Sequence, residues 1–466
     1  MTVSFIICEY NPFHNGHLYH LQETKRLSNS DFVICLMSGD IVQRGQIAIA
    51  DKYARATWAI DGGADVVIEL PCEYVLGSAE LFALGAIKIA NLFDSGKAQE
   101  KHATENSGEN CNCAQGKTAG ENAKTDNGNA PCNFLSFGSE SGDLTELSRL
   151  ATLLSPTNES LQAFVRASLD TGKSYATAVA EGTRKYCLAN NLDDCSPLLG
   201  KSNDILALAY LQAIANTNSR LVPLAIRRIG QAFNETELRE QLLETGITPT
   251  ELSTETYASA TAVRESLFKC NKNCSLLQSF SDPYYSEVRE KLEKNIPEFV
   301  YYDILNALDC DDKLFALAKY KLLNMTSIDG AFGEKNMSLF EGIFGVKEGI
   351  ENRILSAIEN SSSWANFVKN ISSKRYSTAT VQRLLLSILL DNHSTFDELK
   401  NKKITTVNVL AAKKSALHLL GNINANVITK PSDMSKSGAT LPLEQKAYNL
   451  FSAARYHYSP RMKIIE

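Results

Sequence analysis

The first part of the chain alternates short, continuously apolar runs with segments of helical periodicity. The apolar runs, rich in β-branched residues, are 2–10, 31–39 and 64–70. Apolar side chains recur with the spacing of amphipathic helices at 16–27, 51–61 and 78–92. Because unalternated apolar strands are typical of a sheet buried on both faces, this order predicts parallel strands covered by helices on both sides. The predicted fold class is α/β, with a Rossmann-like doubly wound sheet.

Beyond residue 96 the pattern changes twice. Residues 97–133 are rich in Gly, Asn, Lys and Glu and poor in apolar side chains, which predicts a disordered surface insertion. Strands are predicted again at 133–140 and 221–228, then a helical region at 270–395, and finally a strand–helix–strand unit at 404–430. We therefore predict a Rossmann-like domain, a mainly α-helical domain and a small C-terminal α/β unit, with the bounds 1–268, 269–400 and 401–466.

Composition indicates the cellular location of the protein and the redox state of its cysteines. The chain has 466 residues and a net charge of −6. It has no apolar stretch near the roughly 18–20 residues that span a bilayer, and no basic leader, so we predict a cytoplasmic protein without membrane contact. The 11 cysteines are scattered and odd in number, which favours reduced thiols. Cys111, Cys113 and Cys132 lie in the insertion without a CxxC pair, so no protein-bound metal is predicted.

Two of the seven histidines stand three residues apart directly after the first predicted strand, in the stretch HNGH. The carboxyl edge of a parallel sheet is where open α/β folds bind ligands. Gly16 would begin a helix whose free N–H groups attract phosphate, and His14 and His17 would share one face of its first turn. This arrangement suits charge stabilisation on a phosphoryl group without a covalent intermediate. The alternative is a pair of ordinary surface histidines.

The HNGH stretch resembles the HxGH signature of the nucleotidyltransferase superfamily, whose members bind ATP and react at its α-phosphate. The superfamily's second motif, ISSTxIR-like, is similar to SATAVR at 259–264, with Ser259, Thr261 and Arg264 in matching places. Hydroxyl and guanidinium groups at the start of a helix are suitable ligands for the β and γ phosphates. The alternative for SATAVR is a helix N-cap followed by a surface arginine.

A closer resemblance covers nearly the whole chain except the insertion. The order of blocks is similar to that of the tRNA(Met) cytidine acetate ligase family, and the blocks are EYNPFHNGHLYH, MSGDIVQRG, GADVVIELP, SFGSE, SNDILALAY, IRRIG, SATAVR, KEGIENRI and KRYSTATVQRLLLSILL. The resemblance implies that acetate is activated with ATP to acetyl-adenylate and pyrophosphate. The acetyl group would then pass to N4 of the wobble cytidine of elongator tRNA(Met), giving N4-acetylcytidine.

The resemblance also implies site residues. His14, His17 and Arg264 take the catalytic roles, with Arg264 and the Gly16 helix N-terminus assisting the leaving pyrophosphate. The implied ATP contacts are Ile7, Glu9, Tyr10, Asn11, Pro12, Phe13, His14, Asn15, Gly16, His17, His20, Gly138, Asn203, Arg228, Ser259 and Thr261. Asn203 is equally explained as a helix N-cap. Mg²⁺ is expected as the counter-ion of the nucleotide.

Three further polar residues lie near the same predicted edge. Asp40 follows the second strand, where it would orient a histidine, bind magnesium or simply form a turn. Lys52 and Arg55 lie on one turn of the next helix, within possible reach of pyrophosphate or acetate, or else on a solvated helix face.

A local excess of basic residues within 369–414 predicts contact with tRNA in an otherwise acidic protein. Lys374, Arg375 and Arg383 would track phosphates and Tyr376 would stack on an unpaired base, although a solvated helix face explains the same charges. Two other functions stay open at this point. One is an adenylyltransferase acting on a small phosphorylated metabolite, and the other is a nucleotide-regulated RNA-binding protein without turnover.

Overall fold

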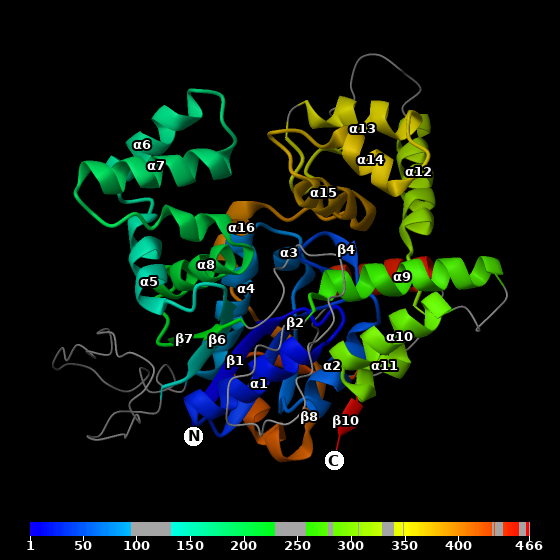
Figure 1. Ribbon diagram of the computed structural model, residues 1–466, viewed down its shortest axis with the longest axis horizontal. Coiled ribbons are helices and arrows are strands. Elements are labelled where there is room, and N and C mark those ends of the chain that lie inside the picture. Colours follow the sequence, from blue (N-terminus) through cyan, green and yellow to red (C-terminus); the bar gives the residue numbers. More distant parts are fainter. Residues whose placement is uncertain are drawn as a thin grey trace.

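A computed structural model describes residues 1–94, 132–228, 258–277, 283–305, 307–328, 340–347, 349–430, 433, 441–455 and 463–465. The predicted insertion at 97–133 lies outside these residues, apart from Cys132 and Asn133. The chain forms one large sheet with helices on both faces and two groups of helices above its carboxyl edge (Figure 1).

The large sheet has the strand order β10-β8-β5-β2-β1-β6-β7, with β9 paired to β8. Its bounds are β1 Val3–Cys8, β2 Phe32–Ser38, β5 Val66–Leu70, β6 Phe134–Ser139, β7 Val222–Arg227, β8 Thr406–Lys413, β9 Asn426–Ile428 and β10 Lys463–Ile465. Strands β5, β2, β1, β6 and β7 are mutually parallel. The order reverses at β1, which pairs with β2 on one side and β6 on the other. The prediction of a doubly wound, Rossmann-like sheet is confirmed.

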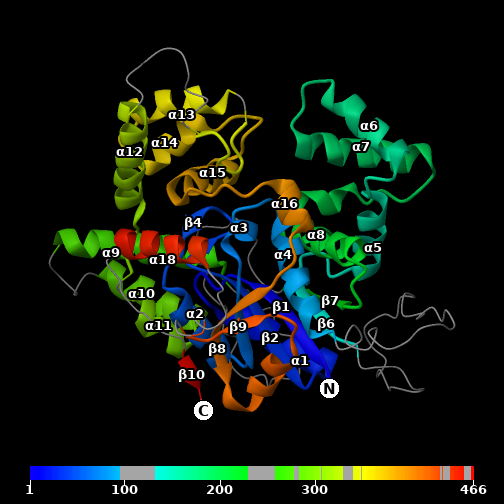
Figure 2. The ribbon, with the colours of Figure 1, turned by 180° about the vertical axis from the view of Figure 1, so that it is seen from behind.

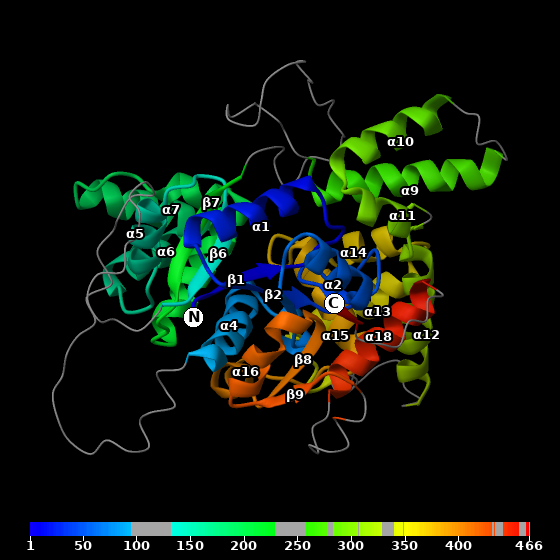
Figure 3. The same ribbon diagram turned by 90° about the horizontal axis from the view of Figure 1, so that it is seen from below.

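Helices pack on both faces of this sheet, as Figure 3 shows from below. The helices of the first part are α1 Asn15–Ser28, α2 Lys52–Asp61, α3 Cys72–Val75, α4 Ala79–Ala90, α5 Leu144–Leu153, α6 Glu159–Leu169, α7 Tyr175–Ala189 and α8 Ser202–Asn216. Alternate residues of the strands face opposite layers. Phe5 of β1 packs with α4 and α8, whereas its neighbour Ile6 packs with α1 and α2. This period of two explains why the strands are apolar throughout.

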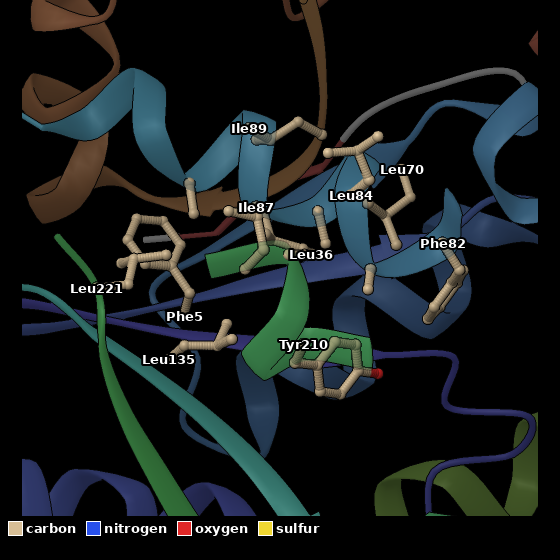
Figure 4. Close-up of a cluster of buried hydrophobic side chains, with 14 of the residues drawn as sticks. Phe5, Leu36, Leu70, Phe82, Leu84, Ile87, Ile89, Leu135, Tyr210 and Leu221 are labelled. Carbon is tan, nitrogen blue, oxygen red and sulfur yellow. The ribbon is translucent and has the colours of Figure 1, made fainter. Parts of the chain in front are cut away.

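The core on the α4 and α8 face is the larger of the two (Figure 4). Phe5, Leu36 and Leu135 extend from three adjacent strands toward Ile87 of α4 and Tyr210 of α8. All five are 5% exposed or less. Burial of this kind stabilises the fold by about 25 cal/mol per Å² of apolar surface. The packed layer therefore holds the strands, and with them the polar residues at their carboxyl ends, in fixed positions.

The later helices form two further groups. They are α9 Ala260–Leu277, α10 Pro283–Asn295, α11 Glu298–Ile304, α12 Asp311–Ile328, α13 Ile350–Glu359, α14 Trp364–Ile371, α15 Thr378–Leu390, α16 Phe396–Asn401 and α18 Pro442–Arg455. Figure 1 shows α12 to α15 above the carboxyl edge of the sheet, opposite the pair α6 and α7. A short hairpin, β3 Ile41–Val42 with β4 Gln46–Ile47, lies at this edge below α15. The predicted helical region is therefore present.

The C-terminal strands differ from the sequence prediction. Residues 401–466 were expected to form a small unit of their own, but β8 pairs antiparallel with β5 and extends the main sheet (Figure 2). The physical reason is that β5 would otherwise be an open edge, and the apolar run of β8 covers it. Among the described residues, no helix is long and apolar enough to cross a membrane.

Candidate active site

The candidate site lies where the strand order reverses, at the carboxyl ends of β1 and β6. The HNGH stretch leaves β1 there and starts α1, while Gly138 and Ser139 end β6 beside it. Arg227 and Arg228 leave β7, the next strand along. In doubly wound folds this crevice is the ligand-binding position, and the pairing of β1, β6 and β7 brings the HNGH, SFGSE and IRRIG blocks together there.

His14 and His17 lie against each other in the first turn of α1. His14 is the N-cap residue, and its Nδ1 accepts the backbone N–H of Gly16 at 3.0 Å. The Nδ1 atom of His17 accepts the backbone N–H of His14 at 3.3 Å. Because Nδ1 is an acceptor in both rings, each neutral imidazole carries its proton on Nε2. The pair therefore presents two N–H donors from adjacent rings.

Burial and neighbouring cations keep these imidazoles neutral. Desolvation, followed by the charges of Arg228 and Arg264, lowers the pKa of His14 to about 3. Desolvation, then His14 and Arg228, lowers the pKa of His17 well below its ordinary value. Desolvation and Arg228 also lower the pKa of His20 to about 4, and its Nε2 lies 3.0 Å from Ser136 Oγ. The site therefore holds neutral imidazoles beside cationic guanidinium groups, an arrangement that suits an anion.

Arg264 joins the SATAVR segment to the HNGH segment. Its guanidinium donates to the backbone carbonyl of Asn11 and, at 3.4 Å, to Thr261 Oγ1. Desolvation lowers the pKa of Arg264 to about 10, and the charge of Glu9 opposes that shift. Ser259 Oγ accepts the backbone N–H of Ala262 at 3.0 Å, at the start of α9. Ser259 thus has the geometry of an N-cap, while Arg264 is turned into the site rather than to solvent.

A second cluster lies at the end of β6. Ideal Cβ geometry at Gly138 would place that atom 3.5 Å from the side chain of Arg228, so the arginine lies over the glycine. Asn203, in the first turn of α8, donates from Nδ2 to Glu140 Oε1 at 2.7 Å. Asp204 is fully buried and accepts from Ser139 Oγ at 2.6 Å. Gly138, Asn203 and Arg228, which were predicted from three separate blocks, therefore meet at one end of the sheet.

The aromatic members of the predicted set support the histidines from within the core. Tyr10 and Phe13 are 2% and 0% exposed, and their ring centroids lie 5.0 and 5.7 Å from that of His17. Pro12 is buried, and Ile7 is half-buried in β1. Asn15 donates from Nδ2 to the carbonyl of Lys294 at 2.9 Å. A direct contact of these side chains with a nucleotide stays a prediction.

Lys52 and Arg55 do not lie on a solvated helix face. Lys52 is 4% exposed, and its Nζ lies 2.8 Å from Glu69 Oε1 and 3.8 Å from Asp40 Oδ2. Arg55 is 0% exposed and donates to the backbone carbonyls of Ala50, Glu9, Ser38 and Gly39. Arg55 thus fixes the loops after β1 and β2.

Asp40 was one candidate for binding magnesium, and its carboxylate already has partners within the protein. Its Oδ1 accepts the backbone N–H of Lys52 at 3.0 Å, and burial raises its pKa to about 6. Among the described residues, no group of three or more His, Cys, Asp or Glu could hold a metal ion. Magnesium therefore stays a prediction tied to the nucleotide.

The predicted tRNA contacts differ in their surroundings. Lys374 and Arg375 are exposed, and the Arg375 guanidinium lies 5.7 Å from the ring centroid of Tyr376. Tyr376 is half-buried against the α12–α15 core. Arg383 instead donates to the carbonyl of Gln43 at 3.0 Å, so it joins α15 to the β3–β4 hairpin. Contact of all four with tRNA stays a prediction.

Sequence reasoning missed three polar residues of the site. Gln46 Oε1 accepts from Arg264 at 3.5 Å, and Glu140 and Asp204 organise the end of β6. Gln46 stands one residue beyond the block MSGDIVQRG, and the other two stand inside SFGSE and SNDILALAY. The sequence signal for Glu140 was its position two residues after Gly138 at the end of a strand, and the signal for Asp204 was its position in the first turn of a helix.

Comparison with known proteins finds relatives along nearly the whole chain. A family model described as HIGH Nucleotidyl Transferase matches residues 1–96 and 126–463. The tRNA(Met) cytidine acetate ligase of Acetivibrio thermocellus is 30% identical over 447 residues, with 94% of this chain and 90% of that protein covered. The protein of the same name from Caldicellulosiruptor bescii is 31% identical over 433 residues, with 92% and 87% covered.

Solved structures show the same fold. Thermotoga maritima TmcAL, crystallised without ligand and with alpha-thio ATP, gives TM-scores of 0.70 and 0.68 at 24% and 23% identity. Each comparison covers 97% of this chain and 92% of the other. The family model and these relatives show that the chain belongs to the tRNA(Met) cytidine acetate ligase family of HIGH nucleotidyltransferases.

Proposed function

We propose that this protein binds ATP at the β1–β6 edge and uses it to activate acetate for transfer to elongator tRNA(Met). The observation that carries the proposal is the pair of neutral imidazoles, His14 and His17, beside the guanidinium groups of Arg228 and Arg264. Two N–H donors and two fixed cations match a triphosphate, because charge-assisted hydrogen bonds to phosphate are the strong ones.

In the first step, a carboxylate oxygen of acetate attacks the α-phosphorus of ATP. The bond from that phosphorus to the α–β bridging oxygen breaks, and pyrophosphate leaves with its electron pair. His14 and His17 donate from Nε2 to the phosphoryl oxygens as charge develops there. Arg264, held over the HNGH turn by the Asn11 carbonyl, neutralises the leaving pyrophosphate together with the N-terminus of α1. Magnesium would enter the site bound to the nucleotide, and it would offset the negative charge of the phosphates.

In the second step, the N4 amine of the wobble cytidine attacks the acetyl carbon. The bond from that carbon to the phosphate oxygen breaks, AMP leaves, and the nitrogen releases a proton. The helices α12 to α15 lie above this edge of the sheet, and α15 is joined to it through Arg383 and Gln43. This placement supports tRNA reaching the site from the α15 side.

The test is acetate-dependent release of pyrophosphate from ATP by the full-length chain, followed by nucleoside analysis of elongator tRNA(Met). Acetate-dependent pyrophosphate together with N4-acetylcytidine is the expected result. Pyrophosphate release that is indifferent to acetate and tRNA would instead indicate an adenylyltransferase with another acceptor. ATP binding with no turnover under any of these conditions would indicate a nucleotide-regulated RNA-binding protein.

A further inference from the structure

Glu140 is a carboxylate held rigidly inside a site that otherwise suits anions. It follows the last residue of β6 and is half-buried. Its Oε1 accepts from Asn203 twice, from the side-chain amide at 2.7 Å and from the backbone N–H at 3.3 Å. The side chain is therefore fixed against the first turn of α8 before any ligand arrives.

The backbone beneath Glu140 is fixed by a second, buried carboxylate. Asp204 Oδ1 accepts the backbone N–H of Glu140 at 2.9 Å, and Oδ2 accepts that of Ser141 at 3.2 Å. The hydroxyl of Ser139 donates to the same Oδ1, and the carbonyl of Ser139 accepts the backbone N–H of Arg228 at 2.9 Å. One buried group thus sets the relative positions of Glu140 and Arg228.

The electrostatic neighbours of Arg228 connect Glu140 with the histidines of the site. The charge of Arg228 contributes to the lowered pKa values of His14, His17 and His20. The charge of Glu140 in turn opposes the desolvation that lowers the pKa of Arg228. Arg228 therefore lies within electrostatic range of both groups. A carboxylate repels phosphate, so a part of a nucleotide that lay against Glu140 would be one that donates hydrogen bonds.

A purine nucleotide offers such donors at the ribose hydroxyls and at the amino group of adenine. The ribose is attached directly to the α-phosphate, whereas the amino group lies at the far end of the base. A carboxylate adjacent to an arginine that faces the phosphate site is thus closer to the sugar. We propose that Glu140 accepts a hydrogen bond from a ribose hydroxyl of the bound nucleotide and makes the site selective for ribonucleotides. The inference rests on the proposed function, since it takes ATP as the nucleotide.

The experiment is calorimetric measurement of Kd for ATP, 2′-deoxy-ATP, 3′-deoxy-ATP and ITP, using the full-length protein and Glu140→Gln and Glu140→Ala variants. The wild type should prefer ATP over at least one deoxynucleotide by about tenfold to a hundredfold, the loss typical of a hydrogen bond to a charged group. In Glu140→Ala that preference should fall to within about threefold. Glu140→Gln, which has the same size and can still hydrogen-bond, should lie between the two. The matched control is Glu146→Gln, a carboxylate of α5 that pairs with Arg149.

Several results would overturn the assignment. One is an unchanged preference for ATP over both deoxynucleotides in a Glu140→Ala variant whose Tm matches that of the wild type. Another is loss of discrimination against ITP alone, which would place Glu140 at the base. If Glu140→Ala unfolds, an unchanged ratio in Glu140→Gln decides against the proposal. The assay uses neither acetate nor tRNA, so a protein that binds ATP selectively but activates no acetate would fail only the proposed function.

Discussion

The imidazole rings of His14 and His17 are stacked, with their centroids 3.8 Å apart and an angle of 26° between their planes. Two protonated rings at this distance would repel each other, and burial already lowers the pKa of each. Both rings are therefore neutral in the folded protein at physiological pH, with the proton on Nε2. The positive charge of the site comes from Arg228 and Arg264, which hold it at every physiological pH.

Two substitutions of His14 distinguish its role as the N-cap of α1 from its proposed role as a hydrogen-bond donor to phosphate. His14→Asn keeps a good N-cap for α1 but removes the Nε2 donor, because asparagine is among the preferred N-cap residues. Acetate-dependent ATP–pyrophosphate exchange should fall by about 10²–10³, as for the loss of one donor to a developing oxyanion. The Tm and the Kd for tRNA should stay near the wild-type values. His14→Ala should lose the same activity and, in addition, about 1 kcal/mol of stability. Exchange at the wild-type rate in His14→Asn would remove His14 from the chemistry.

The lowered histidine pKa values predict how stability depends on pH. The unfolded chain binds a proton on each histidine below about pH 6.5, whereas folded His20 and His14 do so only near pH 4 and pH 3. In this window the unfolded state holds more protons, so the free energy of unfolding falls as pH falls, by up to about 1.4 kcal/mol per pH unit for each histidine. Urea denaturation from pH 7.5 to 5 should show a shallower decline in His14→Asn than in the wild type. Equal slopes would contradict the assignment.

The parts of the molecule that the sequence predicted well are those set by local pattern. The strands β1, β2 and β5 and the helix α1 follow from apolar runs and periodicity, and HNGH follows from its position after β1. The residues that meet in the site come from β1, β6, α8 and α9, and sheet topology brings them together. These residues were predicted from the family resemblance, because their spacing along the chain does not show that they lie close together in the fold.

The features that the sequence left open or predicted wrongly have a common physical cause. Lys52 and Arg55 have the composition of a solvated helix face, but burial among backbone carbonyls and Glu69 decides their role. The strand β8 looked like part of a separate unit because its partner, β5, lies more than 330 residues away in the sequence. Long-range pairing of this kind leaves no local pattern.

Gly45 should be required for the contact between the β3–β4 hairpin and α15. Its φ is +75°, and a Cβ atom there would overlap the backbone nitrogen of Arg383 and lie 2.7 Å from the carbonyl carbon of Gln382. Gly172→Ala is the matched control, since Gly172 has a φ of +79° with nothing within 4 Å of that position. The control should lose about 1–2 kcal/mol from backbone strain alone. Gly45→Ala should lose about 1–3 kcal/mol more by overpacking, measured by urea denaturation. Equal losses would show that α15 moves freely relative to the hairpin.

Shortening the chain between Phe93 and β6 should be tolerated. The ends of the intervening segment meet, because Asn133 Nδ2 donates to the carbonyl of Phe93 at 3.5 Å. A short Gly-Ser linker in place of residues 97–131 should therefore leave the Tm and the acetate-dependent exchange rate near the wild-type values, since loop length costs little. A loss of exchange at unchanged Tm would give the segment a part in the reaction.

The exposed basic pair on the loop before α15 should contribute to tRNA affinity and not to ATP affinity. Lys374→Ala with Arg375→Ala removes two exposed cations, whereas Arg383 is occupied by the Gln43 carbonyl. We expect the slope of log K against log salt for tRNA binding to shrink by about 1–2, with the Kd for ATP unchanged. The matched control is Lys25→Ala with Arg26→Ala, an exposed lysine and arginine in the last turn of α1. Equal slopes in the two double variants would mean that the α15 side carries no specific tRNA contact.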